Sequence, residues 1–436
     1  MSPDRLAEIN ARYHMFSAIS PEIPEDAGFL FSAKDNLTSA GMETKCGSRI
    51  LEGYVPVFDA AAIERMKAAG GALVGKTNMD EFGFGTFSVN SAFGVPLNPF
   101  DPERSCGGSS GGSACAAAVL EGHVSLGVST GGSVSCPASF CGVYGLTPTY
   151  GRVSRHGLID YGNSLDKVGL LSADAPVLGR RLAEISGRDP RDPTSCAQPE
   201  LSLSGKRISS VAAPEEALRG VSGAVGEAFK ASLDRIRESG ADVETISMPS
   251  LRYAIPAYYV IATCEASTNL ARYVGMRYGR QDGDLSLGFD DYFASFRTEY
   301  FGDEAKRRIL LGTYARMAGF RDRYYAKALR VRAHIIESYK EAFGRFDAVA
   351  TPTMPFIAPR FSEISAMSPV DSFAADFLTV PPNLAGIPHL SVPCGYSEGM
   401  PIGLHVSTDH WREDLLASFA EDWSESFKAE RAGVGQ

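Results

Sequence analysis

The spacing of apolar residues along the chain alternates between the spacing typical of helices and that typical of strands. Apolar residues recur at helical spacing over residues 60–69, and two glycines then end the segment. A short apolar run at residues 72–74 follows, as in a buried strand. The same order returns further along, with a strand predicted at 206–212, a helix at 221–239 and a strand at 242–246. This alternation favours an α/β fold.

The second half of the chain has a stronger helical pattern. Residues 305–343 repeat Arg, Lys and Tyr beside Leu, Ile and Ala, which predicts a helical region. The stretch 189–204 has no clear period and is predicted to be a surface loop. The other predicted elements are a strand at 346–350 that runs into a Pro-rich loop, short strands at 390–393 and 402–406, and a closing helix at 411–427.

One segment differs from the rest of an ordinary globular composition. Charged residues make up 22% of the chain, yet residues 105–151 contain a single one, Glu121, beside 11 Gly and 9 Ser. A membrane-spanning helix is excluded there, because it needs about 20 mostly apolar residues and glycine weakens helices. A flexible linker is disfavoured because apolar runs at 116–120 and 124–128 interrupt the segment. The composition predicts a buried site built largely from backbone.

Charge and cysteine content narrow the class of function. The formal net charge is −10, which argues against this chain being the main nucleic-acid binder of any complex. Eight cysteines in 436 residues are too few for a disulfide scaffold, and without a Cys-x-x-Cys pair we expect no metal site. The N-terminus lacks the apolar core of a signal peptide, so we expect a cytoplasmic protein.

Residues 70–77 match the phosphate-binding pattern G-x-x-x-x-G-K-[ST]. That loop needs a strand before its glycines and a helix after them. Here a predicted helix comes first and the variable positions themselves resemble a strand. We therefore interpret the segment as a turn that enters a buried strand.

Residues 107–111 match G-x-S-x-G, the nucleophile motif of α/β-hydrolases. That motif follows a buried strand, whereas the polar stretch 101–106 precedes it here. His389, His405 and His410 are candidate bases, although nothing in the sequence selects one of them. A Ser-His-Asp hydrolase is therefore an alternative that predicts loss of activity when one histidine is changed.

Two glycine–serine clusters, at 107–113 and 129–133, provide a different chemistry. Glycines next to a serine let backbone N–H groups converge on one point, where they can stabilise an oxyanion. The serine then needs a base, and a lysine can serve if burial lowers its pKa. Lys34 follows an apolar run and fits an inward-pointing strand end; the alternative is an ordinary surface lysine.

These residues resemble the amidase signature family. The segments 107–113 and 130–133, with Pro137-Ala138, match its Gly/Ser-rich signature, and the resemblance extends over nearly the whole chain. Within the family it is most specific for the A subunits of glutamyl-tRNA(Gln) amidotransferases. The segments that carry this closer resemblance are 34–36, 75–82, 148–154, 307–309, 311–314 and 383–388.

The resemblance implies roles for individual residues. Ser133 matches the nucleophile, Ser109 matches a bridging serine held by a cis peptide bond, and Lys34 matches the base. The oxyanion hole is expected from the backbone around Thr130, Gly131, Gly132 and Ser133.

Three further residues match substrate-binding positions for glutamine. They are Tyr258, Arg308 and Asp376. Arginine suits an α-carboxylate and aspartate suits an α-ammonium. The alternatives are a helix-surface arginine and a packed tyrosine, whereas Asp376 sits in an otherwise apolar run and has the stronger case.

The resemblance also implies a fold and a set of partners. We expect an α/β fold with a mixed central β-sheet covered by helices on both faces, in a single domain over 1–436. Its catalytic core would be 105–170, and a more helical, substrate-binding part would lie at about 205–345. Glutamine hydrolysis would supply ammonia to a partner B subunit, in a heterotrimer with B and C subunits. No association with a membrane is expected. ATP, Mg and most contacts with Glu-tRNA(Gln) are expected at the B subunit, with no cofactor in this chain.

The sequence departs from the family at three neighbouring positions. Ser129 replaces the usual aspartate, and Ser135 and Cys136 replace arginine and glutamine. The segment before Lys34 is also shorter than is typical. Two alternatives therefore stay open: a stand-alone amidase that hydrolyses a small amide, and a non-catalytic scaffold that keeps the fold.

Overall fold

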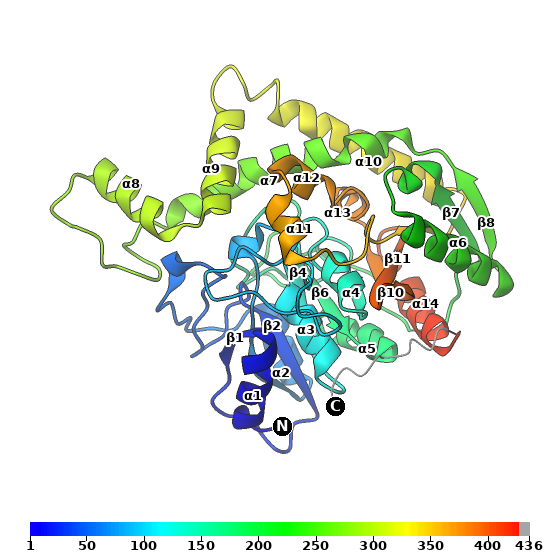
Figure 1. Ribbon diagram of the computed structural model, residues 1–436, viewed down its shortest axis with the longest axis horizontal. Helices are drawn as coiled ribbons and strands as arrows, with labels where there is room; N and C mark the ends of the chain where they lie inside the picture. The colour runs from blue at the N-terminus through cyan, green and yellow to red at the C-terminus, as the bar shows by residue number, and fades with distance from the viewer. Residues whose placement is uncertain (204, 427–436) are drawn as a thin grey trace.

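Extended segments rich in apolar residues pair into one mixed, 11-stranded β-sheet, shown in Figure 1 for the computed structural model. The structure describes residues 1–203 and 205–426. The strand order is β1-β3-β2-β4-β6-β5-β10-β11-β9-β7-β8. The strands are β1 (Phe16–Ile19), β2 (Phe29–Lys34), β3 (Gly71–Thr77), β4 (Val124–Ser129), β5 (Tyr144–Thr147), β6 (Lys167–Ser172), β7 (Ser210–Pro214), β8 (Asp242–Ile246), β9 (Ala348–Pro352), β10 (His389–Ser397) and β11 (Met400–Thr408).

Helices connect the strands and cover the sheet (Figure 1). The α-helices are α1 (Pro3–Tyr13), α2 (Ala61–Ala68), α3 (Gly111–Val119), α4 (Ser135–Phe140), α5 (Ala175–Ile185), α6 (Gly223–Glu238), α7 (Ala254–Asn269), α8 (Phe289–Tyr300), α9 (Asp303–Arg316), α10 (Tyr325–Phe343), α11 (Phe361–Ala366), α12 (Pro369–Ala374), α13 (Val380–Ala385) and α14 (Glu413–Ser426).

The sheet is buried on both faces. Successive strand residues point to opposite faces, and in β6 Leu170 joins one hydrophobic cluster while Leu171 joins another. The first cluster also takes side chains from α2, α5, α6 and α14. On the opposite face, clusters form with α1, α3 and α4 and with α7, α10 and α13. The predicted α/β fold with a mixed central sheet is confirmed.

The register of the central strands brings several segments to one edge of the sheet. Strand β2 runs parallel to β3 and β4, so Lys34 at the end of β2 lies on the same side as Ser129 at the end of β4. Strand β6 runs antiparallel to β4 and pairs Lys167 with Ser129. Residues that follow β4 or precede β6 therefore meet beyond this edge.

Most predicted elements are present, with shifted ends. Strand β8 has the predicted bounds, and α2 and α6 agree with prediction to within two residues at each end. The predicted helical region 305–343 is divided into α9 and α10. Gly319, in the connection, has φ +86, a left-handed conformation that a continuous helix cannot contain. Strand β7 begins at Ser210, four residues later than predicted. Phe427, the predicted end of the last helix, lies outside the described residues.

The prediction of a surface loop at 189–204 is wrong in part. Its residues 189–203 have no helix or strand, but Asp189, Asp192 and Ser195 are buried. Asp189 accepts a hydrogen bond of 2.9 Å from Ser154 Oγ, and its backbone N–H donates to Ser195 Oγ. Side chains of the loop therefore anchor it to the core; Ser204 lies outside the described part of the chain.

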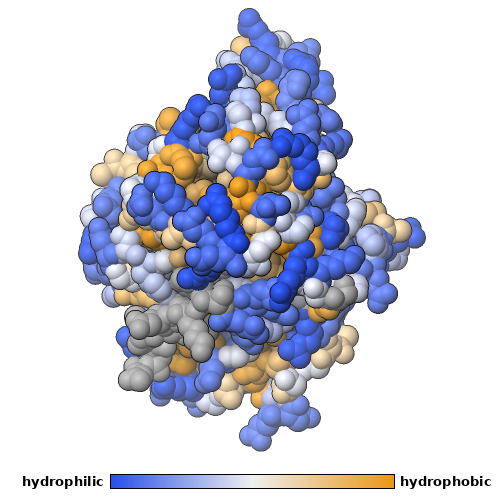
Figure 2. Space-filling view, turned by 90° about the vertical axis from the view of Figure 1, so that its right-hand side faces the viewer, coloured by the Kyte–Doolittle hydropathy of each residue, from blue (hydrophilic) through white to orange (hydrophobic). Residues whose placement is uncertain are grey.

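No helix in the described part of the chain combines the length and apolar character needed to cross a bilayer. Figure 2 shows one face of the molecule, where hydrophilic side chains predominate and apolar ones form smaller patches between them. All eight cysteines are free, and all but Cys196 are buried.

A single sheet runs through the fold. The predicted division of the chain into a catalytic core and a more helical, substrate-binding part stays a prediction.

Candidate active site

Lys34 ends strand β2 and points into the protein. Its side chain is 1% exposed, and its Nζ donates hydrogen bonds to Ser109 Oγ at 2.7 Å and to the Val128 carbonyl at 3.0 Å. Val128 belongs to the neighbouring strand β4, so the parallel pairing of β2 and β4 sets this geometry. The surface-lysine alternative is therefore wrong.

Burial changes the acid–base behaviour of Lys34. Loss of hydration lowers its pKa to about 7, while the negative charges of Asp80 and Asp166 act in the opposite direction. An ordinary lysine is almost fully protonated at neutral pH, whereas an amine with a pKa of about 7 is about half neutral there. Lys34 can therefore accept a proton from the hydroxyl that it contacts.

The cluster at 107–113 places Ser109 against Lys34. The Gly108–Ser109 peptide bond is cis, as the resemblance implies. A Cβ atom at Gly108 would lie 2.3 Å from the Asp80 carboxylate and 2.7 Å from the backbone nitrogen of Ser88, so no larger residue fits. Helix α3 begins two residues later, at Gly111. Glycine at position 108 thus allows the backbone of this cluster to pack closely against Asp80 and Ser88.

The second cluster, 129–133, lies between β4 and α4 and packs directly on the first. The backbone N–H of Ser110 donates to the Ser133 carbonyl at 3.2 Å. Ser133 is nearly buried, at 7% exposure. Among the side-chain hydrogen bonds of the described residues, none joins the Ser133 hydroxyl to Ser109. The fold nevertheless brings the two glycine–serine clusters and Lys34 into one place.

The glycines of the second cluster allow side chains from α7 and from the turn between α12 and α13 to approach it. A Cβ at Gly131 would lie 2.9 Å from the Tyr258 hydroxyl. At Gly132 it would lie 2.2 Å from Thr379 Oγ1 and 3.3 Å from Asp376 Oδ1. Two of the three predicted substrate-binding residues are therefore next to the loop that carries Ser133.

Asp376 is a buried carboxylate with one oxygen in use. Its Oδ2 accepts hydrogen bonds from Thr86 Oγ1 at 2.9 Å and Tyr259 Oη at 3.3 Å. Its Oδ1, on the side of Gly132, has no hydrogen-bond partner in the described structure. Burial raises its pKa to about 6. An unpaired buried carboxylate oxygen suits a cationic group of a ligand.

Arg308, on α9, is buried rather than on a helix surface. Its guanidinium donates to Tyr161 Oη and, at 2.8 Å, to Glu304 Oε1. The rings of Phe84 and Phe373 also lie within about 5.5 Å of its Cζ. Arg308 borders a cavity of about 220 Å³ that Glu304 and Phe373 also line. The arginine can therefore meet an anion that enters this cavity.

Several residues of this site were missed by sequence reasoning. Asp80 and Asp166 bear on the charge of Lys34, Tyr161 contacts Arg308, and Thr86 and Tyr259 contact Asp376. Neither aspartate stands out in the sequence, because Asp80 is followed by Glu81 and Asp166 by Lys167. The tyrosines and Thr86 carry no signal either, since their contacts depend on the tertiary fold.

The candidate histidines are not placed to act on Ser109. His389 and His405 contact each other at 3.0 Å and lie 3.1 and 3.2 Å from Ser135 Oγ. Burial lowers the pKa of both, that of His405 to about 3, so the cluster is uncharged. His410 contacts Asp409 instead. This geometry does not support the Ser-His-Asp alternative.

The phosphate-loop match at 70–77 is a strand, as interpreted from its sequence. Residues from Gly71 onward form β3, and Lys76 is buried with its Nζ 2.9 Å from Thr44 Oγ1 and 3.4 Å from Asp35 Oδ1. Within residues 1–203 and 205–426, no group of three or more His, Cys, Asp or Glu side chains is arranged to hold a metal ion.

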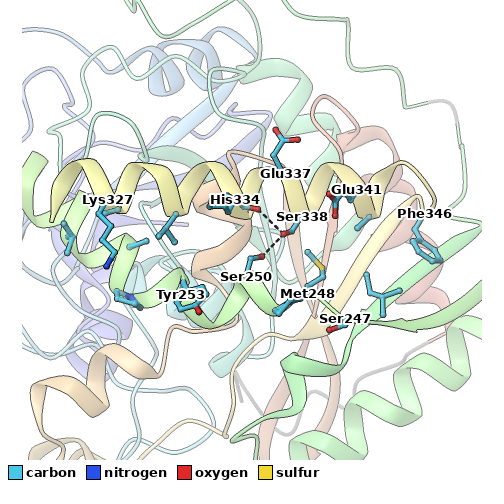
Figure 3. Close-up of a pocket in the computed structure, with 18 of the residues that line it drawn as sticks. Ser247, Met248, Ser250, Tyr253, Lys327, His334, Glu337, Ser338, Glu341 and Phe346 are labelled. Carbon is cyan, nitrogen blue, oxygen red and sulfur yellow. Dashed lines mark hydrogen bonds between the residues drawn. The ribbon is translucent and has the colours of Figure 1, made fainter. Parts of the chain in front are cut away.

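A cavity of about 1340 Å³, shown in Figure 3, is separate from these residues. It lies between α10 and the chain around Met248 and Ser250. Ser338 donates to the His334 carbonyl and contacts Ser250 Oγ at 2.8 Å. Ser250 and Ser338 bond to each other and to backbone, and Ser247 donates to Glu216 Oε1 at 2.7 Å. None of these serines is hydrogen bonded to a lysine as Ser109 is to Lys34.

Comparisons with known proteins identify the family of the chain. The chain matches the family model described as Amidase over residues 16–417. It is 45% identical over 417 residues to the A subunit of glutamyl-tRNA(Gln) amidotransferase of Methanococcoides burtonii, covering 94% of this chain and 87% of that protein. Identity to the same subunit of Archaeoglobus fulgidus is 45% over 401 residues, with coverage of 92% and 86%.

A solved structure gives the same result. The crystal structure of the A subunit of glutamyl-tRNA(Gln) amidotransferase from Thermotoga maritima is 35% identical, with a TM-score of 0.83, and covers 97% of this chain and 90% of that one. The family match extends over most of the sequence, and the fold agrees with that of a family structure. The chain therefore belongs to the amidase family.

Proposed function

We propose that the chain is the glutamine-hydrolysing A subunit of a glutamyl-tRNA(Gln) amidotransferase. One observation carries the proposal: buried Lys34, with a lowered pKa, donates to Ser109, and the next residue, Ser110, donates to the carbonyl of Ser133 in the glycine-rich loop. The relatives named above supply the specific reaction, since they are A subunits of this enzyme. Buried Asp376 beside the loop and buried Arg308 at the neighbouring cavity of about 220 Å³ add groups that suit the two charges of an amino acid.

The proposed mechanism uses Lys34, Ser109 and Ser133 in turn. Neutral Lys34 removes the proton of Ser109, which takes the proton of Ser133 as Ser133 Oγ bonds to the side-chain amide carbon of glutamine. Backbone N–H groups of residues 131–133 stabilise the oxyanion. The proton returns through Ser109 to the amide nitrogen, and the C–N bond breaks to release ammonia. Water, activated by the same relay, then cleaves the γ-glutamyl ester.

The relay predicts how activity depends on pH. Lys34 acts only when it is neutral, and burial lowers its pKa to about 7. The value of kcat/KM should therefore rise as the pH increases through about 7 and then level off, rather than rise only near the pKa of an exposed lysine. Initial rates of ammonia release between pH 5 and 9 measure this. A flat profile across that range would contradict the role of Lys34.

Glutamine would be held by its two charged groups. Arg308 binds the α-carboxylate, Asp376 Oδ1 binds the α-ammonium, and Tyr258 packs beside the oxyanion loop. The partner-free oxygen of Asp376 supports this assignment, because an unpaired buried carboxylate oxygen is costly without a ligand.

Asp376→Asn is expected to raise KM for glutamine about tenfold to a hundredfold, because it removes a charge-assisted hydrogen bond. We expect kcat to change little, since the α-ammonium does not take part in the chemistry. Steady-state kinetics measure both constants. The matched control substrate is glutaramate, which is glutamine without its amino group: its kcat/KM should not fall in the variant. Equal losses for both substrates would contradict the assignment.

We further propose that the chain works in the cytoplasm in a heterotrimer with B and C subunits. The ammonia would pass to the B subunit, where ATP and Mg activate the glutamyl group of Glu-tRNA(Gln). The net charge of −10 suits a chain that leaves most tRNA contacts to its partner. No cofactor is needed for the chemistry proposed for this chain.

Co-expression with candidate B and C subunits tests the function. The purified complex should convert Glu-tRNA(Gln) to Gln-tRNA(Gln) with glutamine as the nitrogen source and ATP present. Free ammonium should replace glutamine when this chain is inactive. If the isolated chain hydrolyses simple amides efficiently and forms no complex, the stand-alone amidase is the correct function. If neither activity is found, the non-catalytic scaffold is correct.

A further inference from the structure

The turn after β4 is held at its first residue, Thr130, by two buried side chains from other parts of the chain. Thr130 Oγ1 donates to Asp166 Oδ1 at 2.6 Å, and Asn383 Nδ2 donates to the Thr130 carbonyl. Both the side chain and the backbone of Thr130 are thereby fixed. The next three residues are those whose N–H groups are proposed to bind the oxyanion.

Asp166 is fully engaged by hydrogen-bond donors. Besides Thr130, the backbone N–H groups of Tyr161 and Gly162 donate to its Oδ2 at 2.9 and 3.0 Å. It is 1% exposed. The carboxylate thus acts as an acceptor that links the segment before β6 to the end of β4.

Asn383 completes the attachment from α13. Its Nδ2 donates to the Leu165 carbonyl at 3.1 Å as well as to Thr130, so one amide joins the residue before Asp166 to the turn. The antiparallel register, in which Ser129 faces Lys167, puts Thr130 and Asp166 opposite each other. These contacts form a frame that holds the turn, in addition to the hydrogen bond from Lys34 to Val128.

We propose that Asp166 and Asn383 are positioning residues that hold Thr130, and through it the backbone N–H groups of residues 131–133, in the geometry that stabilises the oxyanion. The inference rests on the proposed function, since it assigns a support to the proposed nucleophile loop. A hydrogen-bond donor stabilises the transition state only if it is already oriented before charge develops. The role therefore concerns turnover rather than substrate binding.

Thr130→Val tests this role, because valine keeps the shape of threonine but removes the hydroxyl. We expect kcat for glutamine in the co-expressed complex to fall about 10- to 100-fold, less than the loss on deleting an oxyanion donor outright. KM should change less than about twofold, as expected for an interaction made only in the transition state. Thr130→Ser, which keeps the hydroxyl, should recover most of the loss.

A boronic-acid analogue of glutamine separates positioning from folding. Boron takes the place of the amide carbon and forms a tetrahedral adduct with the serine, with an oxygen in the oxyanion position. Its affinity should fall by the same factor as kcat in Thr130→Val, while the affinity for glutamate, a ground-state ligand, is retained. Thr147→Val is the matched control, because Thr147 is equally buried and its hydroxyl has no hydrogen-bond partner.

The outcomes are distinguishable. If the wild-type complex hydrolyses glutamine and Thr130→Val keeps its kcat and boronate affinity, the positioning role is wrong. If glutamate and boronate affinity fall together, the role is structural and the proposal is also wrong. Should Thr130→Val unfold, Asn383→Leu, which keeps nearly the same shape but removes the amide and changes no charge, must show the same selective loss. If the wild-type complex itself does not hydrolyse glutamine, the proposed function fails instead.

Discussion

Replacing Lys34 with methionine is expected to lower glutamine turnover by about 10³-fold or more. Methionine fills the space of the lysine stem without an amine, so Ser109 loses its hydrogen-bond donor at 2.7 Å and the relay loses its base. Lys34→Ala should abolish turnover equally. Because the amine is already partly neutral at pH 7, its removal does not strip a large stabilising charge from the core. Ammonia release in the purified complex is the measurement.

The control for this variant is a lysine outside the site. Lys67 is exposed and pairs with Asp59, so Lys67→Ala should retain full turnover. Thermal unfolding of both variants shows whether either change disturbs the fold. Unchanged glutamine turnover in Lys34→Met would exclude the lysine–serine mechanism, whatever its effect on stability.

Ser133→Ala is expected to lower glutamine-dependent amidation as strongly as Lys34→Met lowers glutamine turnover. It should leave ammonium-dependent amidation unchanged. Without the nucleophile, no γ-glutamyl ester forms, and glutamine-dependent amidation of Glu-tRNA(Gln) should fall by about 10³-fold or more. The same complex should still use free ammonium at the wild-type rate, because that step belongs to the B subunit in the proposed division of work. Side-by-side assays with the two nitrogen sources measure this.

A neighbouring serine supplies the control for Ser133. Ser139 is buried in α4 of the same segment but is not assigned to the relay, and Ser139→Ala should leave both activities intact. If Ser133→Ala abolished ammonium-dependent amidation as well, its effect would be on assembly or folding. If it left glutamine-dependent amidation intact, another residue would have to be the nucleophile.

The three residues of the proposed relay could be predicted because local sequence motifs mark them. Ser109 and Ser133 are recognisable because backbone contact demands glycine beside them, as the 2.3 Å approach of a Gly108 Cβ to Asp80 illustrates. Lys34 is recognisable because an apolar run precedes it in the sequence. These requirements act over a few residues, so the sequence displays them directly.

The contacts between distant residues could not be predicted in this way. Thr130 meets Asp166 because β4 and β6 pair in one particular register, which no short motif encodes. The break between α9 and α10 is another case: helical periodicity continues on both sides, but Met317 has an extended backbone conformation and Gly319 a left-handed one. The pattern of apolar positions therefore predicted the elements but not their exact ends or their cross-contacts.

The structure shows the contacts of two residues that depart from the family pattern, Ser129 and Ser135. Ser135, which replaces an arginine, lies against the uncharged His389–His405 pair, and Ser129 Oγ donates to the Gly131 carbonyl at 3.0 Å. A charge at either position would be buried, whereas the two serines need only neutral partners. The oxyanion turn is therefore supported here by short polar contacts, which is compatible with an active relay.

Trapping the covalent intermediate tests the central claim most directly. The complex is mixed with isotope-labelled glutamine, quenched in acid during turnover and digested, and the peptides are mapped by mass spectrometry. A γ-glutamyl adduct is expected on Ser133, should be released by hydroxylamine as an ester, and should be absent from Lys34→Met. An adduct on Ser109 or on any other residue, or steady turnover in which no adduct forms, would contradict attack by Ser133.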